Sequence, residues 1–396
     1  MHDTIITPAN RVQEIKEYYF SRKLREVAQL NAEGKDIISL GIGGPDRPPH
    51  KSVTDTLIAE SLKSDTHSYQ PYTGIPELRE SMANWYQRTY GVSINPKSEV
   101  LPLIGSKEGV LHISLTFLNP GDGVLVPDPG YPTYTSVSKL VGAEIFNYDL
   151  TENNGWFPDF KQLEKLPLER IKLMWVNYPH MPTGTRANLD VFTKLLEFGR
   201  RHNIVIVNDN PYSLILNDTP TSIMQINGAN EIAIELNSMS KSHNMAGWRV
   251  GMAVSNAKFI EWILKVKSNI DSGQFKPLMS AAAVGLTLDH EWFEELNSEY
   301  QDRRAIAEQI LTELDCYFDP NQTGLFLWGR IPDNMKSGEE LADDLLYNAR
   351  VFVTPGSVFG KNGYRYIRLS LCATTSRLSE ALNRIKQYKN IKNNNE

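Results

Sequence analysis

The sequence predicts an α/β protein built on a mainly parallel β-sheet, with a smaller α+β domain beside it. Short apolar runs begin near residues 124, 171, 204, 232 and 250, and helical stretches separate several of them. This alternation is typical of a parallel sheet with helices on both faces. From about residue 286 a long helical pattern and further short strands follow. The chain, with 396 residues, is also too long for one small core.

These observations predict two domains. The larger domain takes residues 49–285 and contains the sheet. The smaller α+β domain combines residues 1–48 with residues 286–396. Residues 11–33 carry apolar side chains at near-helical spacing, and residues 366–371 read as a strand in the same domain.

The composition excludes several classes of protein. With 41 basic and 47 acidic residues the net charge is −6, which argues against nucleic acid as the main partner. No stretch approaches the roughly 20 apolar residues of a membrane span, and the N-terminus lacks the apolar core of a signal peptide. The two cysteines, Cys316 and Cys372, form no C-x-x-C pair. We therefore expect a cytoplasmic protein without a disulfide scaffold or a metal site.

The segment NSMSKSHNMAGWR, residues 237–249, follows a buried run and carries the most informative chemistry. A lysine amine forms a Schiff base with a carbonyl group, and it is nucleophilic when its pKa is lowered. Hydroxyl groups and a guanidinium suit a phosphate dianion. Lys241, flanked by Ser238 and Ser240 and followed by Arg249, therefore suggests pyridoxal phosphate (PLP) as the cofactor. The alternative is a solvated lysine with an arginine paired to a surface acid.

Two other strand ends fit the same cofactor. The run at 101–104 ends in Gly105, Ser106 and Lys107 before a helical pattern. Such a turn offers free backbone N–H groups to an anion, and Ser106 suits an N-cap. The run at 204–207 ends at Asp209, where a buried carboxylate needs a partner. A carboxylate that keeps the PLP ring nitrogen protonated makes the ring an electron sink, although Asp209 could also cap a turn.

The segment SMSKSHNMAGWRVG and the pattern Y-x-P-x-x-G-x-x-x-L-R from Tyr69 resemble those of class I/II aminotransferases of the aspartate aminotransferase type. The resemblance covers nearly the whole chain. It implies fold type I with a seven-stranded large domain. It also implies a PLP-dependent aminotransferase that moves an amino group from an L-amino acid to a 2-oxo acid, for which we expect 2-oxoglutarate. In relatives the tyrosine at Tyr69 reaches the cofactor phosphate of the neighbouring subunit, which implies a homodimer with a shared active site.

The resemblance also implies roles for single residues. Lys241 would hold PLP and move the substrate proton, Asp209 would meet the ring nitrogen, and Tyr212 would meet the ring oxygen; these three are the predicted catalytic residues. Arg368, with Gly43 beside it, would bind the substrate carboxylate, whereas the alternative for Arg368 is an edge-strand arginine paired with a surface acid. Tyr131 would cover the PLP ring. The predicted cofactor-binding set is Tyr69, Ser106, Lys107, Tyr131, Asn177, Asp209, Tyr212, Ser238, Ser240, Lys241 and Arg249.

One turn departs from the family pattern. The usual asparagine-proline-x-glycine turn supplies an asparagine that hydrogen-bonds the cofactor ring oxygen, and this chain has Met181 there. Losing one neutral hydrogen bond costs about 0.5–1.5 kcal/mol, so we expect PLP binding to survive. The pKa of the Schiff base should change. Asn177, at the preceding strand end, is a candidate substitute donor.

Two other functions stay open at this point. A PLP-dependent carbon–sulfur β-lyase would use the same cofactor pocket. A ligand-binding protein that kept the fold and lost turnover is the other alternative, and Met181 is its only support. The amino donor is also open among aromatic, diaminopimelate-type, alanine-like and methionine-like amino acids. Tyr18, Tyr19 and Phe20 are candidates to line the side-chain pocket.

Overall fold

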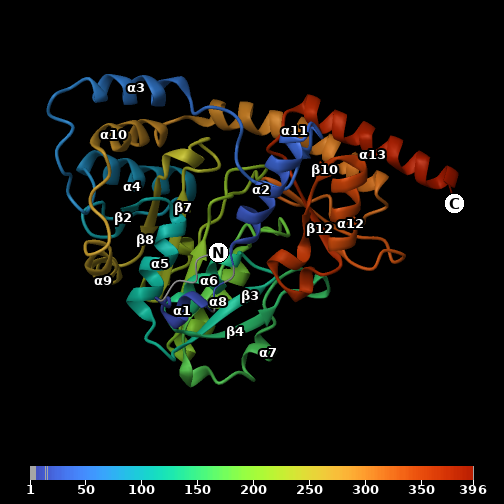
Figure 1. Ribbon diagram of the computed structural model, residues 1–396. Helices are drawn as coiled ribbons and strands as arrows, with labels where there is room; N and C mark the ends of the chain where they lie inside the picture. Colours follow the sequence, from blue (N-terminus) through green and yellow to red (C-terminus); the bar gives the residue numbers. More distant parts are fainter. Residues whose placement is uncertain (1–5, 14, 16, 396) are drawn as a thin grey trace.

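The structure is a computed structural model that describes residues 6–13, 15 and 17–395 (Figure 1). Its central element is a seven-stranded sheet with the order β2-β8-β7-β6-β5-β3-β4. Only β8 runs antiparallel to its neighbours. The strands are β2 (Val100–Leu103), β3 (Gly123–Asp128), β4 (Glu144–Asp149), β5 (Ile171–Val176), β6 (Val205–Asp209), β7 (Ala233–Ser238) and β8 (Gly251–Val254). The predicted mainly parallel sheet is confirmed.

Burial explains why these strands read as apolar runs. Every residue of β2, β3, β7 and β8 is buried, because helices cover both faces of the sheet. Strand β4 lies at the edge, where most of its residues are at least partly exposed. A buried parallel strand leaves no polar face, so its sequence shows a run instead of an alternation.

Two helical layers enclose the sheet. One face packs against α8 (Leu189–His202), which contributes Phe192 and Leu195. The other face packs against α5 (Ser106–Phe117), α6 (Pro132–Leu140) and α9 (Ala257–Lys267). The helices α3 (Lys51–Ser61), α4 (Pro76–Tyr90) and α10 (Lys276–Gly285) lie together at one end of the molecule (Figure 1). A short helix, α7 (Phe160–Leu163), precedes β5.

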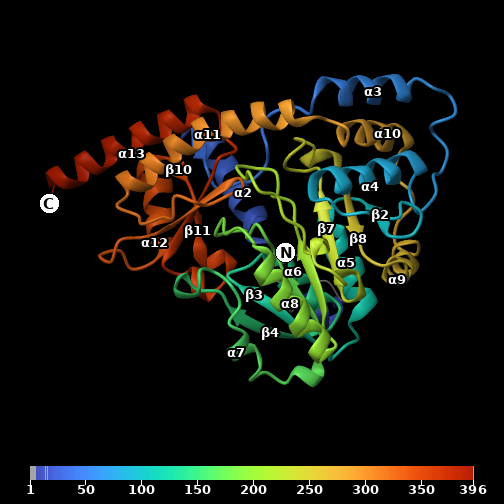
Figure 2. The same ribbon diagram turned by 180° about the vertical axis from the view of Figure 1, so that it is seen from behind.

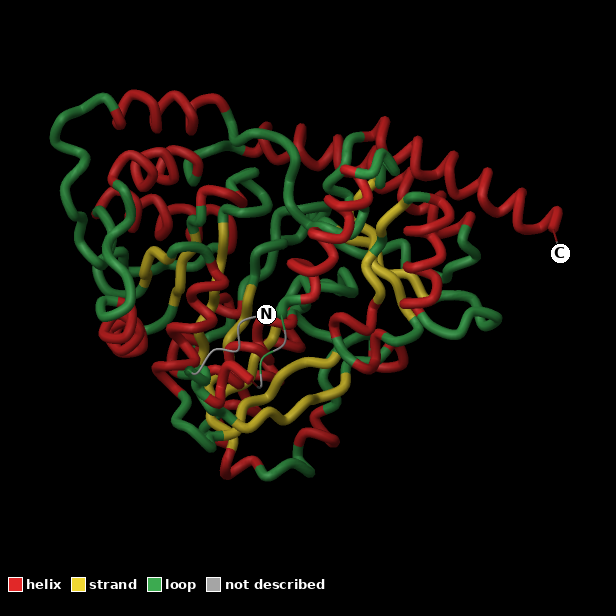
Figure 3. Tube along the Cα trace, viewed as in Figure 1, coloured by secondary structure: helices red, strands yellow, loops and turns green. Residues whose placement is uncertain are grey.

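A second group of strands is built from the C-terminal part of the chain (Figure 3). Strands β11 (Thr354–Pro355), β12 (Tyr366–Ser370) and β9 (Phe326–Arg330) form an antiparallel sheet with β12 in the middle. Helices α11 (His290–Glu313) and α13 (Thr375–Asn395) lie side by side across it, and α12 (Gly338–Asp344) packs nearby (Figure 2). This arrangement is the α+β pattern that the sequence predicts.

The N-terminal segment joins this second group. Strand β1 (Ile38–Ser39) pairs in parallel with β10 (Val351–Phe352). The helix expected over residues 11–33 is divided into α1 (Asn10–Gln13) and α2 (Tyr19–Ala32), because Tyr18 adopts an extended conformation before α2. Helix α2 lies between the two groups of strands (Figure 1). The domain limits at residues 48 and 285 stay a prediction. Among the described residues, no helix is long and apolar enough to cross a membrane.

Candidate active site

The predicted site residues meet at one edge of the seven-stranded sheet. Asp209 is the last residue of β6, Ser238 is the last of β7, and Asn177 directly follows β5. Carboxyl ends of parallel strands are where such sheets bind ligands. A cavity of about 320 Å³ opens there, and every predicted catalytic, cofactor-binding and carboxylate-binding residue except Tyr69 lines it. This volume suits a small organic ligand.

Lys241 follows β7 by three residues and points across the cavity toward the N-terminal segment. Its Nζ donates a hydrogen bond to the backbone oxygen of Gly43 at 2.6 Å. Gly43 has no room for a side chain, because a Cβ there would overlap the ring of Phe326. Burial lowers the pKa of Lys241, and the nearby Arg368 and Arg249 act in the same direction. A lowered pKa makes the amine a better nucleophile and base.

Asp209 is a buried carboxylate with one free oxygen. Its side chain is 4% exposed, and Oδ2 accepts a hydrogen bond from the Tyr134 hydroxyl at 2.9 Å. Its Oδ1 has no partner among the described residues. Burial raises the pKa of Asp209 to about 6. A buried unpaired oxygen beside a cavity calls for a ligand donor, and the protonated nitrogen of a pyridine ring is such a donor.

The first turn of α5 forms an anion cradle with Arg249. Gly105, with φ +78°, is the N-cap of α5, so the predicted cap role of Ser106 is wrong. The left-handed backbone of Gly105 favours glycine, and a Cβ there would also displace the Arg249 guanidinium. Ser106 and Lys107 begin the helix, where backbone N–H groups lack intrahelical acceptors. The Arg249 guanidinium therefore lies against the positive end of a helix.

Two serine hydroxyls complete the cradle. Ser238 Oγ donates to Ser240 Oγ at 2.8 Å, and Arg249 donates to Ser240 Oγ at 3.4 Å and to the Ala246 oxygen at 2.8 Å. Within the described part of the chain, Arg249 forms no ion pair. Hydroxyls, backbone donors and an uncompensated guanidinium together fit a phosphate dianion.

Two tyrosines at this edge of the sheet line the cavity. Tyr131 immediately precedes α6, and its ring centroid lies 5.5 Å from that of Tyr134. Tyr212 follows β6, and its ring contacts Phe326 with centroids 5.8 Å apart. Burial raises the pKa of Tyr212 far above its ordinary value, so its hydroxyl stays a donor at any physiological pH. An aromatic face and a hydroxyl donor are what a flat heteroaromatic ring with an oxygen substituent needs.

Asn177 braces the turn that carries Met181. Its side-chain amide donates to the backbone oxygen of Asp209, and its Oδ1 accepts from the Met181 N–H at 2.8 Å. These two bonds orient the Asn177 side chain, which the sequence leaves open. Both the nitrogen and the oxygen of its amide are bonded to the backbone of this chain. Met181 is 6% exposed, and its Sδ accepts a hydrogen bond from Arg368 at 3.2 Å.

Arg368 is a buried cation without an acidic partner. It lies on β12, the central strand of the smaller sheet, and is 4% exposed, so the edge-strand alternative is wrong. Its guanidinium donates to the Gly41 oxygen at 2.8 Å and lies 3.8 Å from the centroid of the Phe326 ring and 4.6 Å from that of Phe359. Burial lowers its pKa to about 10, which still leaves it charged at neutral pH. No carboxylate pairs with it among residues 6–13, 15 and 17–395, so it can receive a carboxylate from a ligand.

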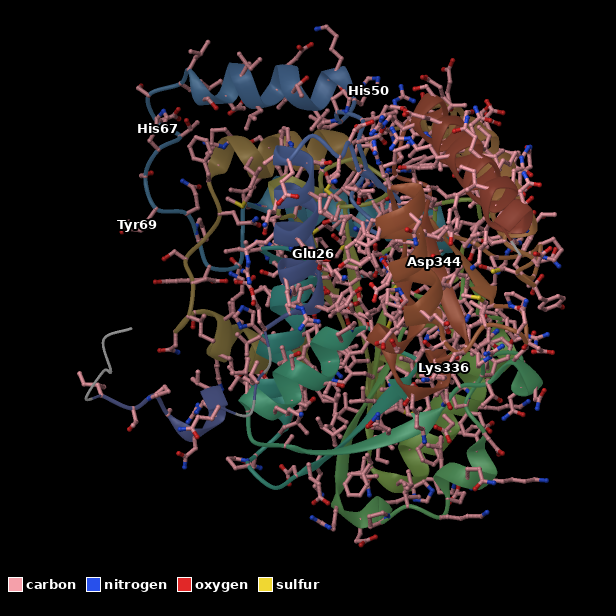
Figure 4. The ribbon with its side chains drawn as sticks, turned by 45° about the vertical axis from the view of Figure 1, so that its right-hand side comes forward. Glu26, His50, His67, Tyr69, Lys336 and Asp344 are labelled. Atoms are coloured by element: carbon pink, nitrogen blue, oxygen red, sulfur yellow. The ribbon has the colours of Figure 1, made fainter. Side chains whose placement is uncertain are left out.

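Tyr69 lies elsewhere. It is 93% exposed on the loop between α3 and α4, at the outer edge of the molecule (Figure 4). It does not line the cavity of its own chain.

The sequence missed three aromatic residues of the site. Tyr134 holds Asp209 and is stacked on Trp175, with ring centroids 5.0 Å apart. Tyr134 lies on α6, three residues after the predicted Tyr131, which is the extended N-cap of that helix, so no shared helix face marked it in the sequence. Phe326 and Phe359 come from the C-terminal part of the chain, and no local motif marks them. Of the three expected aromatics, Tyr18 and Phe20 line the cavity, whereas Tyr19 packs against a separate cluster with Val27.

The chain is similar to known proteins over nearly its whole length. A family model described as aminotransferase class I and II matches residues 35–385. The chain is 40% identical over 381 residues to an LL-diaminopimelate aminotransferase of Moorella thermoacetica, covering 96% of this chain and 97% of the relative. It is 38% identical over 383 residues to one of Dehalococcoides mccartyi, covering 96% and 98%.

Solved structures give the same picture. Substrate-bound BacF from Bacillus subtilis superposes with a TM-score of 0.91 at 36% identity, covering 97% of this chain and 98% of that chain. An aromatic aminotransferase from Pyrococcus horikoshii superposes with a TM-score of 0.85 at 28% identity, covering 93% and 99%.

Proposed function

Because the chain belongs to the class I and II aminotransferase family, we propose that the cavity at the sheet edge is its active site, with the residue roles given below. The chain is a PLP-dependent aminotransferase that takes an amino acid and a 2-oxo acid as substrates. Its curated relatives are aminotransferases, so a carbon–sulfur lyase or a ligand-binding protein without turnover is not favoured.

One observation supports these roles most strongly. Lys241, Arg249 and Arg368 all line one cavity, and none of them is ion-paired within the described residues. Asp209, which lines the same cavity, has one oxygen without a partner there. Asp209 and Arg368 are buried and Lys241 and Arg249 are half-buried. Charges withdrawn from water and left unpaired are costly, so these four are expected together only where ligands pair with them.

The groups present fit PLP. The unpaired oxygen of Asp209 would receive the ring N–H, the Tyr212 hydroxyl would bond the ring oxygen, and Tyr131 would pack on the ring. The backbone of Ser106 and Lys107, with Ser238, Ser240 and Arg249, would hold the phosphate. When bound, PLP supplies an aldehyde for the lysine and an electron-poor ring that takes up the electrons of the substrate Cα–H bond.

The remaining work falls to residues of this chain. Arg368 grips the substrate α-carboxylate with its planar fork of donors and so orients Cα toward Lys241. The Lys241 amine then takes the proton from Cα, and its lowered pKa favours the neutral amine that this step needs. Tyr134 keeps Asp209 in place. The second substrate, for which we propose 2-oxoglutarate, reverses these steps.

The direct test is chemical. Borohydride reduction of the holoenzyme followed by digestion is expected to leave a pyridoxyl group on the peptide that contains Lys241. Adding an amino donor without an acceptor should convert the cofactor to pyridoxamine phosphate. An unmodified Lys241 peptide, together with no pyridoxamine phosphate, would contradict the assignment.

We further propose a homodimer in the cytoplasm, in which each Tyr69 completes the phosphate cradle of the other subunit. The exposed position of Tyr69, on a loop away from its own cavity, supports this arrangement. Mixed dimers test it. Lys241→Ala and Tyr69→Ala subunits, each weakly active alone, should regain activity when refolded or co-expressed together, since the mixed dimer has one intact site. Failure to complement, or a monomer in solution, would contradict the shared site.

A further inference from the structure

Most lining residues that hold neither the cofactor nor the carboxylate are apolar. Tyr18 and Phe20 come from the start of α2, Phe326 from β9, and Phe359 from the loop before β12. We call these four rings the aromatic wall. The Tyr18 and Phe20 centroids are 5.5 Å apart, and those of Phe20 and Phe359 are 6.3 Å apart. Leu24, one turn after Phe20 on α2, extends the apolar surface toward the cavity mouth.

The aromatic wall surrounds the position of the substrate. Arg368 lies over Phe326, Phe359 and Phe20, with its guanidinium 3.8, 4.6 and 5.4 Å from the respective ring centroids. An amino acid held by Arg368 at its carboxylate and facing Lys241 at Cα therefore places its side chain among these rings. The aromatic wall is therefore the surface that contacts the side chain of the substrate.

Among the described residues of this chain that line the cavity, no acidic group is free to receive a second ammonium. Asp209 is the only acid among the described residues that line the cavity, and its role is at the cofactor ring. The acids on the flanking segments are already paired: Glu17 accepts from Arg25 at 2.6 Å, and Asp46 from Arg303 at 2.7 Å. The Arg368 cation already lies over three of the rings, and like charges repel. A second ammonium would lose its water with nothing to replace it.

A second carboxylate on a substrate, in contrast, has a basic residue available to it in this cavity. The ammonium of Lys107 lies 4.8 Å from the centroid of the Tyr18 ring, and no acid pairs with it in the described part of the chain. Lys107 can therefore meet the distal carboxylate of a dicarboxylic 2-oxo acid. The cavity thus accommodates an apolar side chain in the donor and an acidic one in the acceptor.

Resting on the proposed function, we infer that the preferred amino donor carries a neutral, apolar side chain, above all an aromatic one. We also infer that LL-diaminopimelate is discriminated against, because Lys107 can receive its distal carboxylate whereas its distal ammonium has no acidic partner among the cavity residues of the described chain. This donor class differs from the one in the names of the relatives at 38–40% identity. Overall identity reports the shared fold and chemistry, whereas the side-chain preference depends on the few residues of the wall.

Single-turnover measurements test the inference without depending on the acceptor. The PLP form of the enzyme is mixed with L-phenylalanine, L-methionine, L-alanine, L-aspartate or LL-diaminopimelate, and formation of pyridoxamine phosphate is followed by absorbance. We expect L-phenylalanine to react at least 100-fold more efficiently than LL-diaminopimelate. LL-diaminopimelate or L-aspartate as the best donor would overturn the inference and leave the aminotransferase assignment intact. No reaction with any donor would overturn both.

A substitution in the wall checks the assigned surface. Phe20→Ala should lower the ratio of phenylalanine to alanine efficiency tenfold or more, because the ring that meets the aromatic donor is gone. Phe20→Leu, which keeps an apolar contact and guards against misfolding, should lower the same ratio by a smaller factor. Tyr364→Ala, an exposed aromatic outside the cavity, is the matched control and should leave the ratio unchanged. An unchanged ratio in both Phe20 variants would place the side-chain surface elsewhere.

Discussion

Two buried carboxylates on neighbouring strands have opposite surroundings. Glu235, in the middle of β7, is fully buried and accepts hydrogen bonds from Tyr86, Asn208, Ser222 and the Ile223 N–H at 2.6–3.1 Å. Asp209, at the end of β6, has only the Tyr134 hydroxyl, and its second oxygen lacks a partner among the described residues.

The difference separates a structural charge from a functional one. A buried carboxylate with four donors is compensated within the chain and holds neighbouring segments together. A buried carboxylate with one oxygen that accepts no hydrogen bond destabilises the ligand-free protein. Only a bound ligand supplies the missing donor. A buried lysine, Lys267, and the half-buried Lys241 differ in the same way. Lys267 pairs with Asp271 at 2.6 Å, whereas Lys241 meets only a backbone oxygen.

The largest effect is expected at Lys241. Lys241→Ala should lower turnover by more than ~10³-fold, because the covalent attachment and the proton transfer are both lost. Lys267→Ala is the matched control, and we expect it to lower stability while folded enzyme retains turnover. The measurement is pyridoxamine phosphate formation per folded subunit. Substantial turnover by Lys241→Ala would remove the distinction between the two lysines.

Asp209→Asn should cost about 10²-fold or more in turnover, because a neutral amide cannot hold the ring nitrogen protonated. In the cofactor-free protein, the same substitution should raise the free energy of unfolding at neutral pH. The pKa of Asp209 is raised from 3.8 to about 6, so the stability this carboxyl contributes is complete below pH 3.8 and is lost as the pH rises to 6. Above pH 6 the wild type carries a cost on the order of 3 kcal/mol that asparagine avoids.

Denaturant unfolding of both cofactor-free proteins between pH 4 and pH 8 measures this prediction. Above pH 6, Asp209→Asn should be at least as stable as the wild type, and the advantage should shrink as the pH falls. A variant that is less stable at pH 8 would show that Asp209 is compensated within the chain after all.

Glu235→Ala should show the reverse pattern. It leaves the Asn208 amide and the Ile223 N–H without acceptors in a buried site, so we expect a loss of about 3 kcal/mol in the free energy of unfolding. Turnover per folded subunit should change only a few-fold. A large loss of turnover with unchanged stability would assign Glu235 to the active site.

Met181→Asn is expected to have the smallest effect. Met181 lies beside Arg368, and asparagine would add a hydrogen-bond donor that methionine lacks. The change is worth about 0.5–1.5 kcal/mol, so cofactor affinity should change by roughly tenfold or less. The pKa of the Lys241–cofactor linkage, read from absorbance against pH, should shift. An identical titration would mean that residue 181 does not face the cofactor ring oxygen.

The sequence alone predicted the parallel sheet, which the structure confirms, and it placed most of the candidate site residues at one edge of that sheet. This was possible because buried strands leave unbroken apolar runs, and the polar residues that end those runs must meet at one edge. The segment with the lysine and the arginine could also be recognised from the sequence, because Lys241 and Arg249 lie in one short stretch of chain.

Only the tertiary structure decided which charged side chains have a hydrogen-bond or ion-pair partner within the chain. It paired Tyr134 with Asp209, left Arg368 without an acid, and packed Phe326 and Phe359 around it. Tyr134 and Asp209 are 75 residues apart and Gly41 and Arg368 are 327 apart, so local sequence pattern carries no information about these contacts. Whether a buried charge is satisfied depends on the packing of the whole fold, and in this chain that decides which charges await a ligand.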